Sequence, residues 1–218
     1  MNDIYKILVA ATVGFLLSPL TEILKTLISS RQQKSKLIAK LKTFEIILCR
    51  AIRTTTKTIK DRESFIENPE KHLSTAFIIP NFNFPKIDSN IDSAYHMLSS
   101  SQRSMLLDLE SQGIGIEKHL KKLSNIVEEC KSTIYHKVNI TKEIKEILEV
   151  RDIEKEHFTR ALACEKAILY SAACMLATAR RIIKNDPKNP NDRDTIKDIS
   201  DELNIEIDLN WWQSFRNQ

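Results

Sequence analysis

The chain has 218 residues, enough for one domain and an additional segment, and only three of them are glycine. So few glycines disfavour sandwiches and barrels, whose frequent turns use glycine, and exclude a glycine-rich phosphate-binding loop. The formal charge of +4 is unevenly distributed, because residues 29–60 carry nine basic side chains and one acid whereas residues 61–218 are mildly acidic. The abundance of Lys, Leu, Ile, Glu and Ala predicts an all-α protein.

The first 28 residues predict a membrane anchor. Residues 7–21 contain no charged side chain. With residues 4–6 they give about 27 Å of helix, close to the roughly 30 Å hydrocarbon thickness of a bilayer. Residues 22–28 continue as an amphipathic, interfacial stretch. Because basic residues follow the apolar run far more densely than they precede it, we expect a single-pass protein of the inner or plasma membrane. Its N-terminus would lie outside and its C-terminal domain in the cytoplasm.

Three other interpretations of the first helix stay open. A cleaved signal peptide would need positive charge before the apolar run, whereas here the charge follows it. A helix buried inside an oligomer would explain why the uncharged run is short for a membrane span. Ala10, Gly14 and Ser18 form a row of small residues that permits close helix packing. A pore-forming or membrane-disrupting effector that oligomerises through this row is the third interpretation.

Residues 29–66 predict a basic amphipathic helix, which we call the neck. Its apolar residues alternate at spacings of four and three, as in an amphipathic stripe or a coiled-coil seam, and Asn68 and Pro69 end it. Readers of nucleic acid usually interleave aromatic residues with basic ones, and the neck contains only Phe44. We therefore expect the neck to bind anionic lipid headgroups and not nucleic acid. The residues assigned to the membrane surface are Arg31, Lys34, Lys36, Lys40 and Lys42.

Two further segments are candidates for contact with a protein partner. Residues 67–87 predict a loop with three prolines and three phenylalanines, long enough to need an explanation. Residues 187–218 predict a linker, a short polar helix ending near Asn204, and a tail that contains both tryptophans. The aromatic side chains either dock on the bundle or face a partner. The candidate partner-binding residues are Phe82, Phe84, Trp211 and Trp212.

Residues 88–186 predict the core of an antiparallel bundle of long helices behind the single N-terminal transmembrane helix. The first core helix is expected to begin near Asp88 or Asp92 and to break or kink at Gly113 and Gly115.

The second core helix is predicted from Thr141 to about Lys184, before the stop signal Asp186-Pro187. Ten of the nineteen residues from 161 to 179 are alanine, cysteine or serine. This density of small side chains predicts the central helix of the bundle, because neighbouring backbones can approach it closely. Its uncharged stretch measures about 20 Å, too short for a second membrane span.

Little in the sequence supports a metal site or redox chemistry. The four cysteines are scattered without a CxxC pair, which predicts free thiols in a reducing compartment. Glu154 and His157 form one Glu-x-x-His pair, but the second pair that a di-iron bundle needs does not occur. We expect no metal site and no cofactor.

The seven residues from Arg151 to His157 offer the one catalytic hypothesis. They resemble the Arg-x(4–6)-His motif of HEPN ribonucleases, small all-α domains often found in bacterial defence and toxin systems. The resemblance implies that His157 acts as general base or acid for attack by a ribose 2′-hydroxyl, and that Arg151 steadies the phosphate. The alternative is a solvated helix face with local ion pairs, since the surrounding acids would repel RNA.

From these features we expect a membrane-tethered, cytoplasmic helical interaction or effector protein without enzymatic activity. Its partners would be membrane lipid and either another protein or further copies of itself. A role as a membrane effector in bacterial defence fits such a protein. A HEPN-like, metal-independent ribonuclease is the second hypothesis, and the pore-forming effector is the third.

Overall fold

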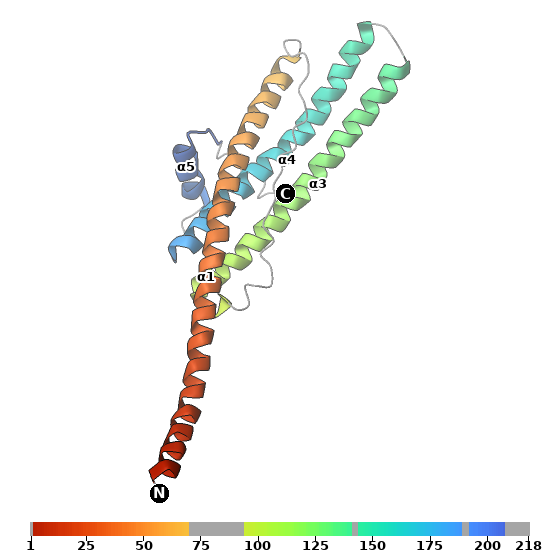
Figure 1. Ribbon diagram of the computed structural model, residues 1–218. Coiled ribbons are helices and arrows are strands. Elements are labelled where there is room, and N and C mark those ends of the chain that lie inside the picture. The colour runs from red at the N-terminus through yellow and green to blue at the C-terminus, as the bar shows by residue number, and fades with distance from the viewer. Residues whose placement is uncertain (1, 70–93, 141–143, 189–191, 208–218) are drawn as a thin grey trace.

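The computed structural model is all-α over the residues that it describes, which are 2–69, 94–140, 144–188 and 192–207. Side chains are described for 19, 21–69, 94–134, 150–188 and 193–207. The helices are α1 (Asn2–Glu67), α3 (Ser100–Ile140), α4 (Ile144–Lys184) and α5 (Asp192–Leu203) (Figure 1).

The centre of the bundle is α4, against which α1, α3 and α5 all pack. Both α1 and α3 run antiparallel to α4 (Figure 1). The small residues of α4 line this contact, and Ala161, Ala172, Ala173 and Ala179 are completely buried. The predicted central position of this helix is confirmed, because alanines allow two helices to approach α4 closely.

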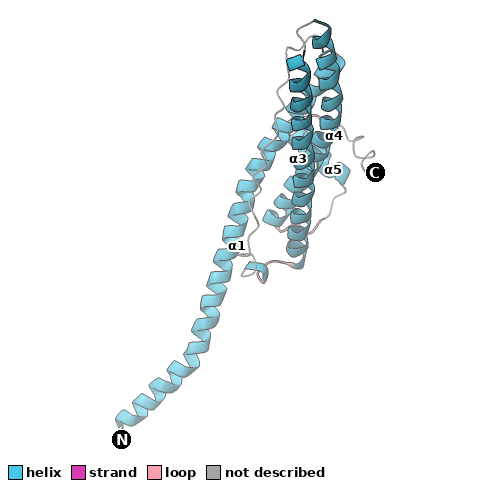
Figure 2. Ribbon diagram, turned by 90° about the vertical axis from the view of Figure 1, so that its right-hand side faces the viewer, coloured by secondary structure: helices cyan, strands magenta, loops and turns pink. Residues whose placement is uncertain are grey.

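The first helix, α1, is much longer than its contact with the bundle. Its 66 residues give about 99 Å of helix, without interruption at Pro19. The first buried side chain among those described along it is Leu37. Figures 1 and 2 show the N-terminal half of α1 extending away from the other helices. The predicted anchor and neck therefore form one continuous helix, which ends at Glu67 as Asn68 and Pro69 predicted.

The start of α3 differs from the prediction. The helix begins at Ser100, whereas Asp88 and Asp92 lie outside the described residues. Ser99 caps it: the Gln102 N–H donates to Ser99 Oγ, and the Ser99 N–H donates to Gln102 Oε1, both at 3.1 Å. This reciprocal pair is a capping box, whose Ser-x-x-Gln spacing is readable from the sequence.

The predicted break at Gly113 and Gly115 is wrong, because α3 continues through both residues. Neither glycine has a positive φ. A glycine inside a helix costs about 1 kcal/mol relative to alanine. Burial of Leu109 and Ile116 on either side offsets that cost, since each such side chain contributes about 1.5–3 kcal/mol.

Two helices end in the same manner. Asn185 follows α4 with a φ of 53°, and Asn204 follows α5 with a φ of 50°. The next N–H in each case reaches back to a helix carbonyl at 3.0 Å, from Asp186 to Arg181 and from Ile205 to Ser200. This arrangement is the Schellman motif. The predicted helix ends near Lys184 and Asn204 are confirmed, whereas Thr141 lies outside the described residues.

Among the residues with described side chains, one helix, Val150–Lys184, is long and apolar enough to cross a membrane. However, 61% of its apolar window is buried inside the bundle, and core helices of proteins without a span meet the same criteria. It is therefore weak support for a membrane association. Residues 1–18 lie outside this comparison because their side chains are not described.

Candidate functional site

The stretch of α1 between its apolar N-terminus and the bundle exposes large apolar side chains. Ile23, Leu24, Leu27 and Ile28 are 43–56% exposed. At 100° per residue they span an arc of about 140°, opposite Glu22, Lys25 and Ser29. No other described part of the chain covers this arc, since Leu37 is the first described side chain that the bundle buries.

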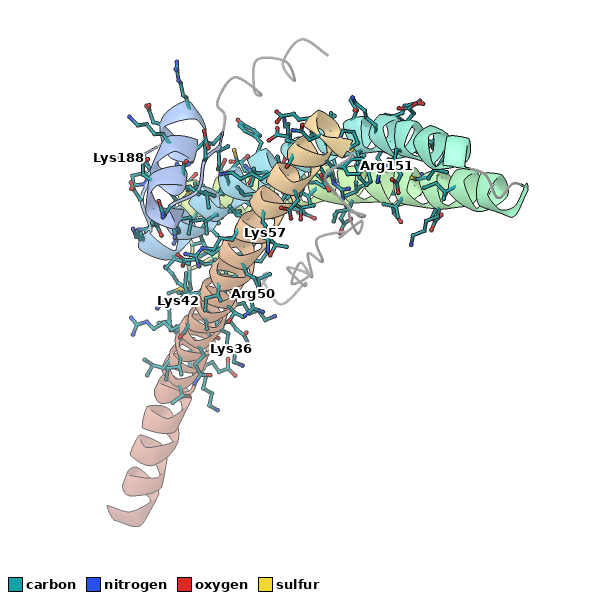
Figure 3. All side chains as sticks on the ribbon, turned by 90° about the horizontal axis from the view of Figure 1, so that it is seen from above. Lys36, Lys42, Arg50, Lys57, Arg151 and Lys188 are labelled. Carbon is teal, nitrogen blue, oxygen red and sulfur yellow. The ribbon has the colours of Figure 1, made fainter. Side chains whose placement is uncertain are left out.

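Most basic side chains of the neck point to the outer side of α1, away from the bundle. Eight of its nine basic side chains are exposed, and Lys36, Lys42, Arg50 and Lys57 follow one another along the helix (Figure 3). The ninth, Lys34, is half-buried, and its Nζ donates to the carbonyl oxygen of Met97 at 2.9 Å. Four of the five predicted membrane-surface residues are therefore exposed to solvent, and Lys34 instead joins α1 to the segment that precedes α3.

Two acidic groups of the neck, Glu45 and Glu63, are paired with basic residues of α4. Glu45, the only acid among the nine basic residues, accepts a hydrogen bond from Arg180 Nε of α4 at 2.7 Å. Arg180 also contacts Glu202 of α5 at 2.5 and 2.6 Å, and these hydrogen bonds raise the pKa of Arg180 despite its burial. Because Glu45 is held at Arg180, between α1 and α4, the outer face of the neck keeps its positive charge.

A buried ion pair holds the C-terminal end of α1 against α4. Arg62 Nε lies 2.6 and 2.8 Å from the two carboxylate oxygens of Glu165, and the side chains are 1% and 0% exposed. Burial raises the pKa of Glu165, and the charge of Arg62 opposes that rise. The guanidinium also lies over the ring of Phe158, 5.1 Å from its centroid, where it gains a cation–π contact.

His157 lies in the contact between α4 and α3 and is only 5% exposed. Its Nδ1–H donates to the Ile153 carbonyl at 2.8 Å, and its Nε2 is 3.8 Å from Glu129 Oε1. Glu129 accepts two hydrogen bonds of 3.0 Å from Arg160, which lower its pKa. The group nearest to His157 Nε2 among the printed contacts is therefore a carboxylate, which would repel a phosphate.

Arg151 and His157 do not converge on one point. Both belong to α4, and a six-residue separation places side chains about 120° apart around a helix. Arg151 is half-buried. The described structure does not bring the two residues of the HEPN-like motif together.

The other predicted sites have different outcomes. Phe82, Phe84, Trp211 and Trp212 lie outside the described residues. Within the described parts of the chain, no group of three or more His, Cys, Asp or Glu side chains is placed to hold a metal ion. The cysteines are free there, with Cys130 and Cys164 buried and Cys49 and Cys174 half-buried, as predicted. Burial, with Glu154 and Glu129 nearby, raises the pKa of Cys130 to about 11.

Comparison of the chain with protein-family models, with curated proteins and with solved structures finds no match. The proposed function therefore rests on the geometry of the chain itself.

Proposed function

We propose that the protein is a membrane-tethered helical interaction protein, anchored by residues 1–28 and carrying its bundle on the cytoplasmic side. The observation that carries this proposal is the continuity of α1, which runs from the apolar N-terminal segment into the bundle as one helix. A rigid helix of this kind can connect a membrane anchor directly to the folded bundle. The expected address is the inner or plasma membrane, with the N-terminus outside.

The exposed apolar arc supports an interfacial position for residues 22–28. Leaving Ile23, Leu24, Leu27 and Ile28 in water forgoes roughly 25 cal/mol for each Å² of apolar surface. An amphipathic helix recovers this free energy by burying such an arc at the boundary between headgroups and acyl chains. The arc directly follows the uncharged run, so one membrane can accommodate both.

The basic neck adds an electrostatic contribution that decreases along α1. On an upright helix, Arg31 lies about 15 Å beyond residue 21, within the headgroup layer plus one Debye length of about 8 Å. A basic residue near an anionic surface contributes about 1 kcal/mol. Lys36, Lys40 and Lys42 lie progressively further out, so we assign most of this contribution to Arg31.

The bundle offers a surface for a protein partner on α3. Leu107 and Ile114 are 60% and 64% exposed, and their seven-residue spacing places them on the same face of the helix. The bundle leaves both side chains exposed, so they are available to a partner. The ribonuclease hypothesis has less support, because Arg151 and His157 diverge and Glu129 faces the imidazole.

The anchor is tested by carbonate extraction of cell membranes that contain the full-length protein. A Leu16→Arg substitution places a charge inside the uncharged run, which costs about 2.5–3.5 kcal/mol on insertion. We expect wild type in the membrane pellet and the Leu16→Arg variant in the supernatant. The matched control Ile114→Arg, on an exposed position of α3, should stay in the pellet. Extraction of the wild type, or a Leu16→Arg variant that remains in the pellet, would contradict the proposal.

A further inference from the structure

The outer face of the neck beyond Lys40 is a positively charged stripe, formed by Lys42, Arg50, Arg53 and Lys57. These side chains fall within an arc of about 80° around α1 and are all exposed. None of the four has a carboxylate within 4 Å among the described residues, whereas the cations between helices are paired, such as Arg62, Arg160, Lys166 and Arg180. No ion pair in the described structure therefore compensates the positive charge of the stripe.

A negatively charged stripe lies on α5. Asp194, Asp198 and Asp201 are exposed and, at spacings of four and three, share one face of the helix. The opposite face of α5 is buried in the bundle through Ile196, Ile199 and Leu203. Asp198 and Asp201 therefore point away from the buried face, and neither has a basic group within 4 Å in the described structure.

The two stripes lie at the same level along the molecule. Arg180 connects Glu45 of α1 to Glu202 of α5, and Lys60 of α1 lies 3.5 Å from Glu206, just after α5. These contacts place α5 beside the part of α1 that carries the basic stripe, as Figure 1 also shows. At this common level, each stripe can meet the oppositely charged stripe of a second copy.

We propose that a second copy of this chain binds here, with the basic stripe of α1 in each copy against the acidic stripe of α5 in the other. The two copies are related by a two-fold axis parallel to α1, which makes both contacts equivalent. This proposal rests on the membrane tether proposed above, since a shared membrane holds two copies parallel and at equal height. An antiparallel pair would direct the two anchors away from each other.

The membrane itself does not suit the basic stripe. Lys57 lies about 54 Å along α1 from residue 21, several times the Debye length of about 8 Å. Nucleic acid suits it poorly as well, because the acids of α5 lie beside the stripe and would repel phosphates. A second copy presents carboxylates at the required level and brings no such repulsion.

The test uses two charge-reversal variants of the full-length protein in mild detergent. One carries Arg53→Glu and Lys57→Glu, and the other carries Asp198→Lys and Asp201→Lys. Light scattering at low salt should show dimers of wild type, and each variant alone should dissociate with a Kd raised at least about tenfold, because like charges then face each other. Mixing the two variants in equal amounts should restore the dimer, since both contacts again join opposite charges.

The mixing experiment separates contacts between copies from contacts within one copy, because only the former respond to mixing. The matched control is Lys118→Glu with Lys121→Glu on α3, which makes the same change in net charge at exposed positions and should leave the dimer intact. Circular dichroism should show unchanged helicity in all variants. A monomeric wild type, dimers of either variant alone, or a mixture that stays monomeric would overturn the proposal.

Binding of the basic stripe to anionic lipid or to RNA would give a different result. If Arg53→Glu with Lys57→Glu abolishes binding to phosphatidylserine vesicles or to RNA while the dimer persists, the stripe serves that partner and the proposal fails. The tether is decided separately by the extraction of the Leu16→Arg variant. Failure of the tether and failure of the dimer are therefore distinguishable.

Discussion

The contact of α1 with the rest of the bundle has two sections of different chemistry. In the apolar section, residues 37–52, it buries leucine, isoleucine, phenylalanine and alanine side chains. In the polar section, residues 55–62, it buries three threonines and Arg62 together with Ile59. Two of these hydroxyls, of Thr56 and Thr58, donate to carbonyls of their own helix at 2.9 and 3.0 Å.

The two sections contribute differently: the apolar section mainly stabilises the contact, whereas the polar section sets its register. The apolar section gains free energy from burial in proportion to area, and that gain tolerates small shifts in register. The polar section gains little from Thr56 and Thr58, whose hydroxyls bond to α1 itself. Among its described contacts across the interface, the buried Arg62–Glu165 pair demands a register, because an unmatched buried charge is costly.

The largest expected effect comes from breaking that pair. Glu165→Ala leaves the guanidinium of Arg62 buried without its carboxylate, and should lower the free energy of unfolding by about 3–5 kcal/mol. Urea denaturation followed by circular dichroism measures this. The double variant Arg62→Met with Glu165→Leu should be close to wild type or more stable, because no charge is then buried. A loss below about 1 kcal/mol in Glu165→Ala would show that the pair does not hold the polar section.

Truncation in the apolar section should cost slightly less. Leu48 is completely buried, and Leu48→Ala is expected to lower the free energy of unfolding by about 3 kcal/mol through lost burial and the remaining cavity. Ile46, two residues earlier and 66% exposed, is the matched control, and Ile46→Ala should change stability by less than about 0.5 kcal/mol. Equal effects of the two substitutions would mean that α1 does not pack as described.

A smaller effect concerns the dependence of stability on pH at the upper end of α3 and α4. Arg160 lowers the pKa of Glu129 from its ordinary 4.5, so this group stabilises the fold above pH 4.5. The contribution is lost as the pH falls below 4.5 through the pKa of the folded state. Wild type should therefore lose stability in acid more steeply than Glu129→Gln, as measured by urea denaturation at a series of pH values. Parallel pH profiles would contradict this pairing.

For the last variant, His157→Ala, we expect no effect on RNA. If His157 serves packing and the contact with Glu129, His157→Ala should not alter the fate of RNA incubated with the full-length protein. The measurement is gel analysis of RNA after incubation with wild type and variant. RNA that wild type trims and His157→Ala leaves intact would establish the ribonuclease hypothesis instead.

Local sequence patterns, within a few residues of one another, were sufficient to predict much of the architecture. Helix-forming composition predicted the all-α class, and proline-containing stops predicted the ends of α1 and α4. The run of small residues predicted the central place of α4. The same local reasoning failed at Gly113 and Gly115, where propensity favours a break and tertiary burial of Leu109 and Ile116 overrides it. It also overlooked the Ser99–Gln102 capping box, although its spacing is present in the sequence.

The contacts of the site needed the tertiary structure. The Lys34–Met97, Arg62–Glu165 and His157–Glu129 contacts join residues that are far apart in the chain, and composition, periodicity and spacing do not encode such pairs. The sequence by itself determined the helices, the apolar N-terminal segment and the basic face of the neck, because these depend on neighbours within a turn or two. Only the folding of α1, α3 and α5 onto α4 decided which charges are neutralised, which stay exposed, and that the motif around His157 faces a carboxylate.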